Sequence, residues 1–345
     1  MNLRAARILV CLTLSFLLFA ACQQKAGRVV GRGFYYWKTN VNISSYENSY
    51  MDSLKTDRLY LRVFDVDVAG KKAMPKAIIN IGKGLPQKKI VPVVFITPAG
   101  LNAMSWDELG FYARNIATLL EEQSIKAGIA PEEVQVDCDW TQNNKERYFE
   151  LLQKLKQQAY FKGKKLSVTI RLHQVKYLAA SGIPPADKGL LMVYNIDNLR
   201  NIKVENSILN VTSATSYLGT VGSYPLPLDI ALPIFQWTLL FEAEQLKGIL
   251  RDVDRRDLEQ KAGLEAMNDH TFKVTKDQLL KGYTLKKGQV LRLEESHIER
   301  VNEIAKYLSA RIKTDSLNLL LYHCDSVNFK NYTIHELEEV FSRFD

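Results

Sequence analysis

The chain has 345 residues and a formal net charge of +8. Hydrophobic residues make up 46% of it and charged residues 24%, which is ordinary for a packed domain and excludes a disordered chain. The basic excess is spread along the sequence without a basic arm or an aromatic and basic repeat, so we expect no nucleic-acid partner.

The first 21 residues have the order of a secretory signal peptide. Arg4 and Arg7 come first, residues 8–19 are an apolar run, and residues 20–22 (Ala-Ala-Cys) close it. The apolar run is too short to span a bilayer, which takes roughly 20 residues. The closing residues resemble the lipobox of bacterial lipoproteins, which implies that Cys22 becomes the lipidated first residue. An ordinary signal peptide that is cut nearby is the alternative.

A lipidated Cys22 would hold the mature chain on a bilayer. We expect residues 22–32 to be a polar tether and residues 33–345 to be the folded domain. Gln23 and Gln24 follow the cysteine, without the aspartate that tends to retain lipoproteins at the inner membrane. The resemblance therefore implies the outer membrane and its periplasmic side, where a short tether reaches only nearby polymers.

Short apolar or alternating runs recur between helical patterns along the domain. We expect strands at residues 33–37, 58–66, 90–97, 134–140, 166–172, 190–196, 229–235 and 317–324, with the clearest amphipathic helices at residues 106–123 and 144–159. This alternation predicts an α/β fold, a (β/α)8 TIM barrel. An open doubly wound sheet is the alternative, but no glycine-rich phosphate loop follows the first strand.

The interval between the seventh and eighth strands is too long for a simple crossover. We expect a small α+β insertion at about residues 240–312, with strands at 271–275 and 289–293 and helical segments at 240–258 and 294–312. Such an insertion would overhang one rim of the barrel.

Cys138 and Cys324 are the cysteines that remain after the signal peptide is removed and Cys22 is acylated. Both lie in expected strands, and a disulfide in an oxidising compartment is one alternative. Buried free thiols are the interpretation that we favour. The sequence has no CxxC pair and no HExxH motif, so we expect no metal and no other cofactor.

Polar and aromatic residues gather at the expected carboxyl ends of the strands, where barrels of this kind carry their chemistry. They are Tyr36, Trp37, Asp65, Asp67, Asp137, Asp139, Trp140, Arg171, His173, Tyr194, Asn195, Asp197, Gln236, Trp237, His323 and Asp325. Carboxylates and amides bind sugar hydroxyls, and aromatic rings stack on the apolar face of a sugar. We therefore expect a carbohydrate polymer as the ligand.

The fourth strand carries the sharpest signal. In the stretch 134–141 (VQVDCDWT), strand alternation places Asp137 and Asp139 on the same side of the strand. Two carboxylates that face a barrel interior are costly unless they are hydrogen-bonded or share a proton. This pair is either a catalytic acid site or a buried polar anchor.

This stretch resembles the catalytic strand of family-18 glycoside hydrolases, the chitinase-like barrels, whose pattern ends Asp-x-Asp-x-Glu. Residues 192–195 (MVYN) resemble the Met-x-Tyr-Asp of that family, and many chitinases also carry an α+β insertion after the seventh strand. The chain also resembles uncharacterised bacterial barrels near the glycosidases that have an Asp-x-Asp strand. The family's proton donor falls on Thr141, and its sixth-strand aspartate falls on Asn195.

A threonine hydroxyl cannot protonate a glycosidic oxygen at neutral pH. Two interpretations remain open. The barrel binds glycan without catalysis, or Asp139 acts as the acid with Asp65, Asp67 or Asp325 as its partner. A scaffold lipoprotein in envelope assembly is the alternative from another class of function.

Several single residues also have a purely structural interpretation. Each expected strand-end tryptophan either stacks on a sugar or packs the rim, His173 is a general base or a polar cap, and His323 either forms a dyad with Asp325 or merely shares a strand face with it. A metal site at Asp65 and Asp67 lacks further ligands in the sequence.

Overall fold

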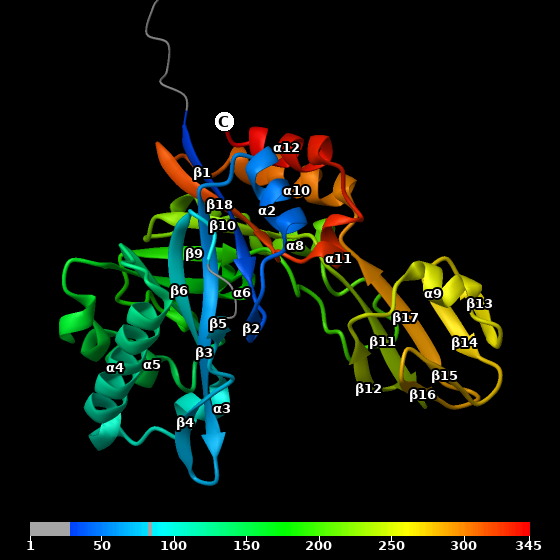
Figure 1. Cartoon of the computed structure of the whole chain (residues 1–345), viewed down its shortest axis with the longest axis horizontal. Coiled ribbons are helices and arrows are strands. Elements are labelled where there is room, and N and C mark those ends of the chain that lie inside the picture. Colours follow the sequence, from blue (N-terminus) through cyan, green and yellow to red (C-terminus); the bar gives the residue numbers. More distant parts are fainter. Residues whose placement is uncertain (1–27, 82–84) are drawn as a thin grey trace, which may run out of the picture.

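The computed structural model describes residues 28–81 and 85–345. Eight parallel strands close into a barrel in the order β1-β18-β10-β9-β8-β7-β6-β3, with β3 paired back to β1 (Figure 1). These strands are β1 (Val29–Tyr36), β3 (Arg58–Ala69), β6 (Lys89–Ile96), β7 (Glu133–Cys138), β8 (Lys165–Arg171), β9 (Lys188–Met192), β10 (Leu228–Pro233) and β18 (Ser316–Tyr322). The expected α/β fold, a (β/α)8 TIM barrel, is confirmed.

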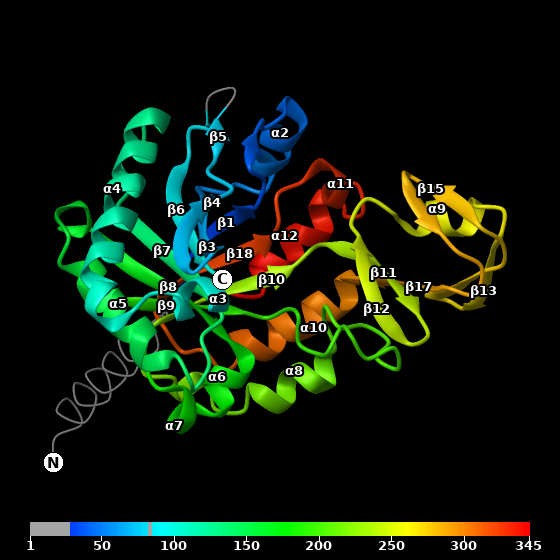
Figure 2. The same ribbon diagram turned by 90° about the horizontal axis from the view of Figure 1, so that it is seen from below.

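Helices surround the barrel strands (Figure 2). They are α2 (Ser45–Ser53), α3 (Pro98–Asn102), α4 (Leu109–Ala127), α5 (Lys145–Lys156), α6 (Leu172–Lys176), α7 (Leu178–Ser181), α8 (Val211–Tyr217), α10 (Ile298–Ser309), α11 (Ser326–Phe329) and α12 (Ile334–Ser342), with short 3-10 turns at Trp106–Glu108, Ala159–Phe161 and Val221–Ser223. In α4 the buried residues Leu109, Ala113, Ile116 and Leu120 recur at a spacing of three or four, which turns one apolar stripe toward the strands. Its end is set by Gly128, which has a φ of 65°.

The folded domain begins earlier than the sequence predicted. Val29 already pairs with Ser316 of β18, and its amide donates to the carbonyl of Asp315 at 2.9 Å. Residues 29–32, which we expected in a tether, are therefore strand. The expected signal peptide and Cys22 lie outside the described residues. Within the part of the chain that the structure describes, no helix is long and apolar enough to cross a membrane.

The insertion after β10 is mainly an antiparallel sheet, in the order β12-β11-β17-β14-β13. Its elements are β11 (Gln236–Glu242), β12 (Gln245–Leu250), α9 (Arg255–Gln260), β13 (Leu264–Asn268), β14 (Thr271–Val274), β17 (Val290–Glu295) and the small hairpin of β15 (Gln278–Leu280) and β16 (Tyr283–Leu285). The helix expected at 240–258 was wrong. Ala243 and Glu244 both have positive φ, 47° and 63°, so this stretch makes a two-residue hairpin turn without the usual glycine or asparagine.

Two further small elements flank the barrel. The strand β4 (Lys72–Lys76) runs antiparallel to the end of β3, and the resulting hairpin projects beyond the other strands (Figure 1). The two-residue strands β2 (Asn40–Val41) and β5 (Asn80–Ile81) pair with each other.

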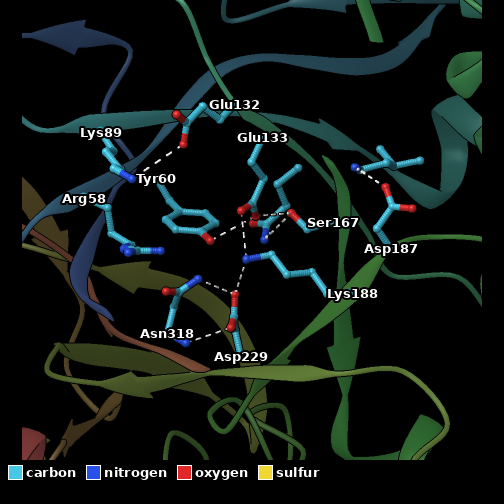
Figure 3. Close-up of polar contacts among 12 residues, drawn as sticks. Arg58, Tyr60, Lys89, Glu132, Glu133, Ser167, Asp187, Lys188, Asp229 and Asn318 are labelled. Atoms are coloured by element: carbon cyan, nitrogen blue, oxygen red, sulfur yellow. Dashed lines mark hydrogen bonds and ion pairs between the residues drawn. The ribbon is translucent and has the colours of Figure 1, made fainter. Parts of the chain in front are cut away.

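A cluster of polar side chains closes the barrel at the amino-terminal ends of its strands (Figure 3). We call Tyr60, Glu133, Ser167, Lys188, Asp229 and Asn318 the basal charge cluster. Lys188 Nζ lies 2.8 Å from Glu133 Oε2 and 2.5 Å from Asp229 Oδ2. Tyr60 and Ser167 donate hydroxyl protons to Glu133 at 3.0 and 2.6 Å, and Asn318 donates to Asp229. Each buried charge thus has an opposite charge and neutral donors around it.

Candidate functional site

The interior face of β7 carries polar side chains along its whole length. Glu133 belongs to the basal charge cluster, and Gln135 accepts a hydrogen bond from the hydroxyl of Tyr35. Thr169 Oγ1 donates to Asp137 Oδ1 at 2.6 Å, and Arg171 donates to Asp139 Oδ1 at 2.8 Å. Asp137 and Asp139 therefore face the barrel interior together, as alternation predicts.

A small cavity of about 140 Å³ lies at the carboxyl ends of the barrel strands. We call it the mouth pocket. Its lining residues are Tyr35, Trp37, Phe95, Asp137, Asp139, Arg171, Met192, Tyr194, Asn195 and Tyr322. Six of the residues singled out from the sequence meet here: Trp37, Asp137, Asp139, Arg171, Tyr194 and Asn195.

Aromatic rings form most of the wall of the mouth pocket. Tyr194 and Tyr322 stack with their ring centroids 4.9 Å apart and their planes 28° apart. Trp37 contacts the rings of Tyr322 and Phe95 at centroid distances of 5.9 and 6.1 Å. The guanidinium of Arg62 lies 5.5 Å from the centroid of the Trp37 ring. These edge and offset contacts hold the rings in place without a ligand.

Arg171 ties the strand β8 to two other sides of the pocket. Its guanidinium forms an ion pair with Asp139 at 2.8 Å and donates to the backbone carbonyl of Asn195 at 3.1 Å. Asn195 has a φ of 53°, a left-handed conformation that asparagine tolerates better than most residues. Its side-chain oxygen is buried and has no hydrogen-bond partner among the described residues. The lining therefore contains one buried acceptor that has no hydrogen-bond partner in the described structure.

Asp137 lies at the buried end of the site. Burial, followed by the charge of the neighbouring Asp139, raises its pKa to about 7, although the hydrogen bond from Thr169 opposes the change. Near neutral pH this carboxyl group is thus partly protonated and can donate as well as accept a hydrogen bond.

The raised pKa of Asp137 gives a testable pH dependence. The folded chain holds this proton up to about pH 7, whereas the unfolded chain releases it near the ordinary value of 3.8. Ionisation therefore favours unfolding as the pH rises. Between pH 5 and pH 8 we expect the wild type to lose about 2 kcal/mol of unfolding free energy relative to Asp137→Asn. Urea unfolding of both proteins measures this difference, and an unchanged difference across the range would contradict the assignment.

The other carboxylates named as catalytic partners are each held by a cation outside the pocket lining. Arg62 forms a two-point contact with Asp65, with one N–O distance of 2.6 Å. Lys76 lies 3.1 Å from Asp67, and Lys38 lies 3.1 Å from Asp325.

The surroundings of Asp67 and Asp325 also show what these two carboxylates do. The hydroxyl of Thr97, followed by backbone and Lys76 contacts, lowers the pKa of Asp67 to about 2. Asp325 caps α11 by accepting from the amide of Val327 at 2.9 Å. These roles are structural.

Three predicted ligand contacts lie elsewhere in the fold. Trp140 is 1% exposed and packs outward on Tyr148 at 5.1 Å, so of its two interpretations the structure favours packing. Trp237 donates to Glu294 at 2.8 Å and packs against Phe235, and Gln236 lines a separate cavity. Alternation explains Trp140, because it shares the outward face of β7 with Val136 and Cys138.

The two candidate histidines, His173 and His323, do not line the mouth pocket. His173 is exposed on α6, and burial followed by the positive charge of Arg171 lowers its pKa. His323 is mostly buried, its Nδ1 has no partner among the described residues, and burial lowers its pKa to about 4. No hydrogen bond joins His323 to Asp325 in the described structure, which favours the alternative that the two residues merely share a strand face.

Thr141 and the two cysteines lie outside the lining of the mouth pocket. Thr141 is exposed, and both its amide and its hydroxyl donate to Asn144 Oδ1, at 2.7 and 3.3 Å. Cys138 and Cys324 are separate buried free thiols, as we favoured from the sequence. No group of three or more metal-ligating side chains occurs within residues 28–81 and 85–345.

Solved structures of other proteins share this fold. A chitinase from Chromobacterium violaceum superposes with a TM-score of 0.57 at 12% identity, covering 91% of this chain and 99% of that one. The spore cortex-lytic enzyme SleL of Bacillus cereus gives 0.56 at 11% identity, covering 92% and 75%. A GH18 chitinase from Cycas revoluta in complex with (GlcNAc)4 gives 0.52 at 10% identity, covering 92% and 100%. Neither a protein-family model nor a curated protein matches the sequence.

The chain shares the (β/α)8 barrel fold with these solved structures. At 10–12% identity this likeness concerns the fold alone. What the pocket binds and whether it reacts depend on its own side chains.

Sequence reasoning missed several residues of the mouth pocket. Tyr35 lies two residues before Trp37 on β1, so alternation alone could have placed both on one face. Tyr322 ends β18 and Phe95 lies near the end of β6, where each looks like an ordinary core residue of an apolar run. Arg62 lies over the Trp37 ring but outside the pocket lining, and alternation does not place it, because the strand register shifts between Arg62 and Phe64.

Proposed function

We propose that the mouth pocket binds one sugar unit of an envelope glycan and does not hydrolyse it. The observation that carries the proposal is the ion pair between Arg171 and Asp139 at 2.8 Å, inside a pocket walled by aromatic rings. Two neighbours with the same fold are a chitinase in complex with (GlcNAc)4 and a spore cortex-lytic enzyme, which supports a glycan as the ligand class.

The pocket has the chemistry that a sugar ring requires. Trp37 and Tyr322 present rings for stacking on the apolar face of a sugar. The buried side-chain oxygen of Asn195 lacks a hydrogen-bond partner in the described structure, and protonated Asp137 can donate a hydrogen bond to a sugar oxygen. At about 140 Å³ the pocket is smaller than the roughly 300–1,000 Å³ that enclose drug-sized ligands, which suits a single sugar ring.

Hydrolysis needs a protonated acid beside the leaving oxygen and a second carboxylate across the bond. Asp139 accepts from the guanidinium of Arg171 at 2.8 Å, and this ion pair argues against Asp139 as the acid. Asp65, Asp67 and Asp325 each have their own cation, and Thr141 has no acidic group. Asp137 is the one carboxyl group of the lining that can carry a proton near pH 7, but the other, Asp139, is paired with Arg171, so no second free carboxylate lines the pocket. The side chains thus support binding.

Binding is tested by titrating the mature chain with (GlcNAc)4 and with soluble peptidoglycan fragments in a calorimeter. Trp37→Ala should weaken binding about tenfold, because one stacking ring is lost. Trp106→Ala is a matched control, since Trp106 also has an arginine over its ring, at 5.4 Å, but lies outside the mouth pocket. Equal losses in both variants, or no binding of any glycan by the wild type, would overturn the proposal.

We further propose that Cys22 is acylated and that the chain resides at the periplasmic face of the outer membrane. The order of the first 22 residues supports this, as do Gln23 and Gln24 after the cysteine. Metabolic labelling with a fatty-acid analogue should mark the wild type and not Cys22→Ser. Membrane fractionation of the same two proteins would reveal the anchor, and label on both would contradict it.

A further inference from the structure

We propose that the amino-terminal face of the barrel lies against an anionic bilayer surface, so that the mouth pocket faces away from the membrane. This inference rests on the proposed lipid anchor at Cys22 and goes beyond it, because it assigns a contact surface and an orientation.

The described chain enters the fold at the amino-terminal face of the barrel. Val29 opens β1 at the amino-terminal end of the parallel barrel, beside Ser316 of β18. Cys22 precedes Arg28 by six residues, and a fully extended chain spans only about 3.5 Å per residue. An acyl group on Cys22 can thus lie no more than about 20 Å from this face. The β3–β4 hairpin, which projects beyond the carboxyl ends of the strands, lies at the other end of the molecule (Figure 1).

The loops that lead into the barrel strands carry exposed basic side chains. Exposed basic side chains precede or open β6, β8 and β18, and one follows α2; they are Lys55, Lys89, Lys162, Lys165, Arg311 and Lys313. Of these, only Lys89 has a carboxylate partner in the described structure, Glu132 at 3.5 Å. Lysines at a surface are attracted to anionic headgroups within a Debye length.

Two large apolar side chains are exposed on the same face. Ile125 in the last turn of α4 and Val29 at the start of β1 are 75% and 69% exposed, more than any other exposed large apolar residue among those described. Both lie at the end of the barrel that carries the unpaired lysines. Exposed aliphatic side chains between lysines suit the boundary between headgroups and acyl chains.

Vesicles of phosphatidylethanolamine and phosphatidylglycerol test the surface without the acyl anchor. We would use the mature chain with Cys22→Ser and measure its partition by co-sedimentation. Lys162→Gln, Lys165→Gln and Lys313→Gln together should lower the partition coefficient about a hundredfold, at about fivefold per lysine. The matched control is Lys273→Gln, Lys286→Gln and Lys287→Gln, three exposed lysines of the insertion without ion-pair partners in the described structure. An equal loss in the control, or no binding to these vesicles, would overturn the proposed surface.

Orientation is tested with the acylated chain in the same vesicles. Dyes are placed on Lys165→Cys or on Lys71→Cys at the β3–β4 turn, and energy transfer to a headgroup acceptor is measured. We expect strong transfer from position 165 and weak transfer from position 71. Stronger transfer from position 71 would overturn the proposed orientation. If the chain is not acylated but still binds vesicles in the first test, only the proposed lipid anchor is refuted.

Discussion

Glu294→Gln should lower the free energy of unfolding by about 3–5 kcal/mol, because it leaves a buried arginine without its counter-charge. Glu294 is 0% exposed and Arg292 is 1% exposed, and the pair lies 2.7 Å apart on β17. Glu294 also accepts hydrogen bonds from Ser207 at 2.6 Å and Trp237 at 2.8 Å. The glutamine can keep some of these bonds but cannot neutralise the guanidinium.

Urea unfolding followed by tryptophan fluorescence measures this loss. The control is the double variant Arg292→Met with Glu294→Gln, which removes both charges and should recover most of the stability. If the single variant costs less than about 1 kcal/mol, or if the double variant is no more stable than the single one, the ion pair does not have the role described.

Glu294→Gln should also weaken glycan binding at the mouth pocket. Arg292 donates to the backbone carbonyls of Asn201 and Leu199. The backbone carbonyl of Ser207 accepts a hydrogen bond from the amide of Ile196. The insertion thereby holds the loop that presents the carbonyl of Asn195 to Arg171. A Glu294→Gln protein that is still folded should therefore bind glycan more weakly than the wild type.

Lys188→Met should be the second strongly destabilised variant, by about 3–5 kcal/mol. Lys188 Nζ bridges Glu133 and Asp229 at 2.8 and 2.5 Å, and these carboxylates are 8% and 5% exposed. Without the ammonium group, two like charges face each other in the basal charge cluster (Figure 3). Tyr60, Ser167 and Asn318 still donate hydrogen bonds but do not neutralise the pair.

The matched control is Lys165→Met, at the start of β8 on the same face, with an exposed side chain that has no ion-pair partner in the described structure. Surface substitutions of this kind usually change stability by less than about 0.5 kcal/mol. Thermal and urea unfolding should therefore show a much larger loss of unfolding free energy for Lys188→Met than for Lys165→Met. Similar losses in both would mean that the cluster contributes little more than surface charge.

The sequence predicted the barrel because its signals are local. Strand alternation and the strand–helix rhythm depend on residues a few positions apart, and both were confirmed by the closed sheet. The same alternation placed Asp137 and Asp139 correctly, and it would have turned Trp140 outward had we applied it there.

What could not be predicted depends on contacts between distant segments. Arg171 and Asp139 are 32 residues apart, and only the packing of β8 beside β7 brings them into an ion pair. The turn at Ala243 and Glu244 has no turn residue in its sequence, so an apolar stretch looked helical. Tertiary pairing with β17 decides that it forms strands.

The mouth pocket should bind glycan without cleaving it, and one measurement tests this most directly. The mature wild-type chain is saturated with (GlcNAc)4 or with peptidoglycan fragments in a binding titration, and the ligand is then recovered and analysed by mass spectrometry for new reducing ends between pH 5 and pH 8. We expect saturable binding that Trp37→Ala weakens, and recovery of the ligand intact. Cleavage that is abolished by Asp139→Asn would contradict the claim and would make the barrel an enzyme.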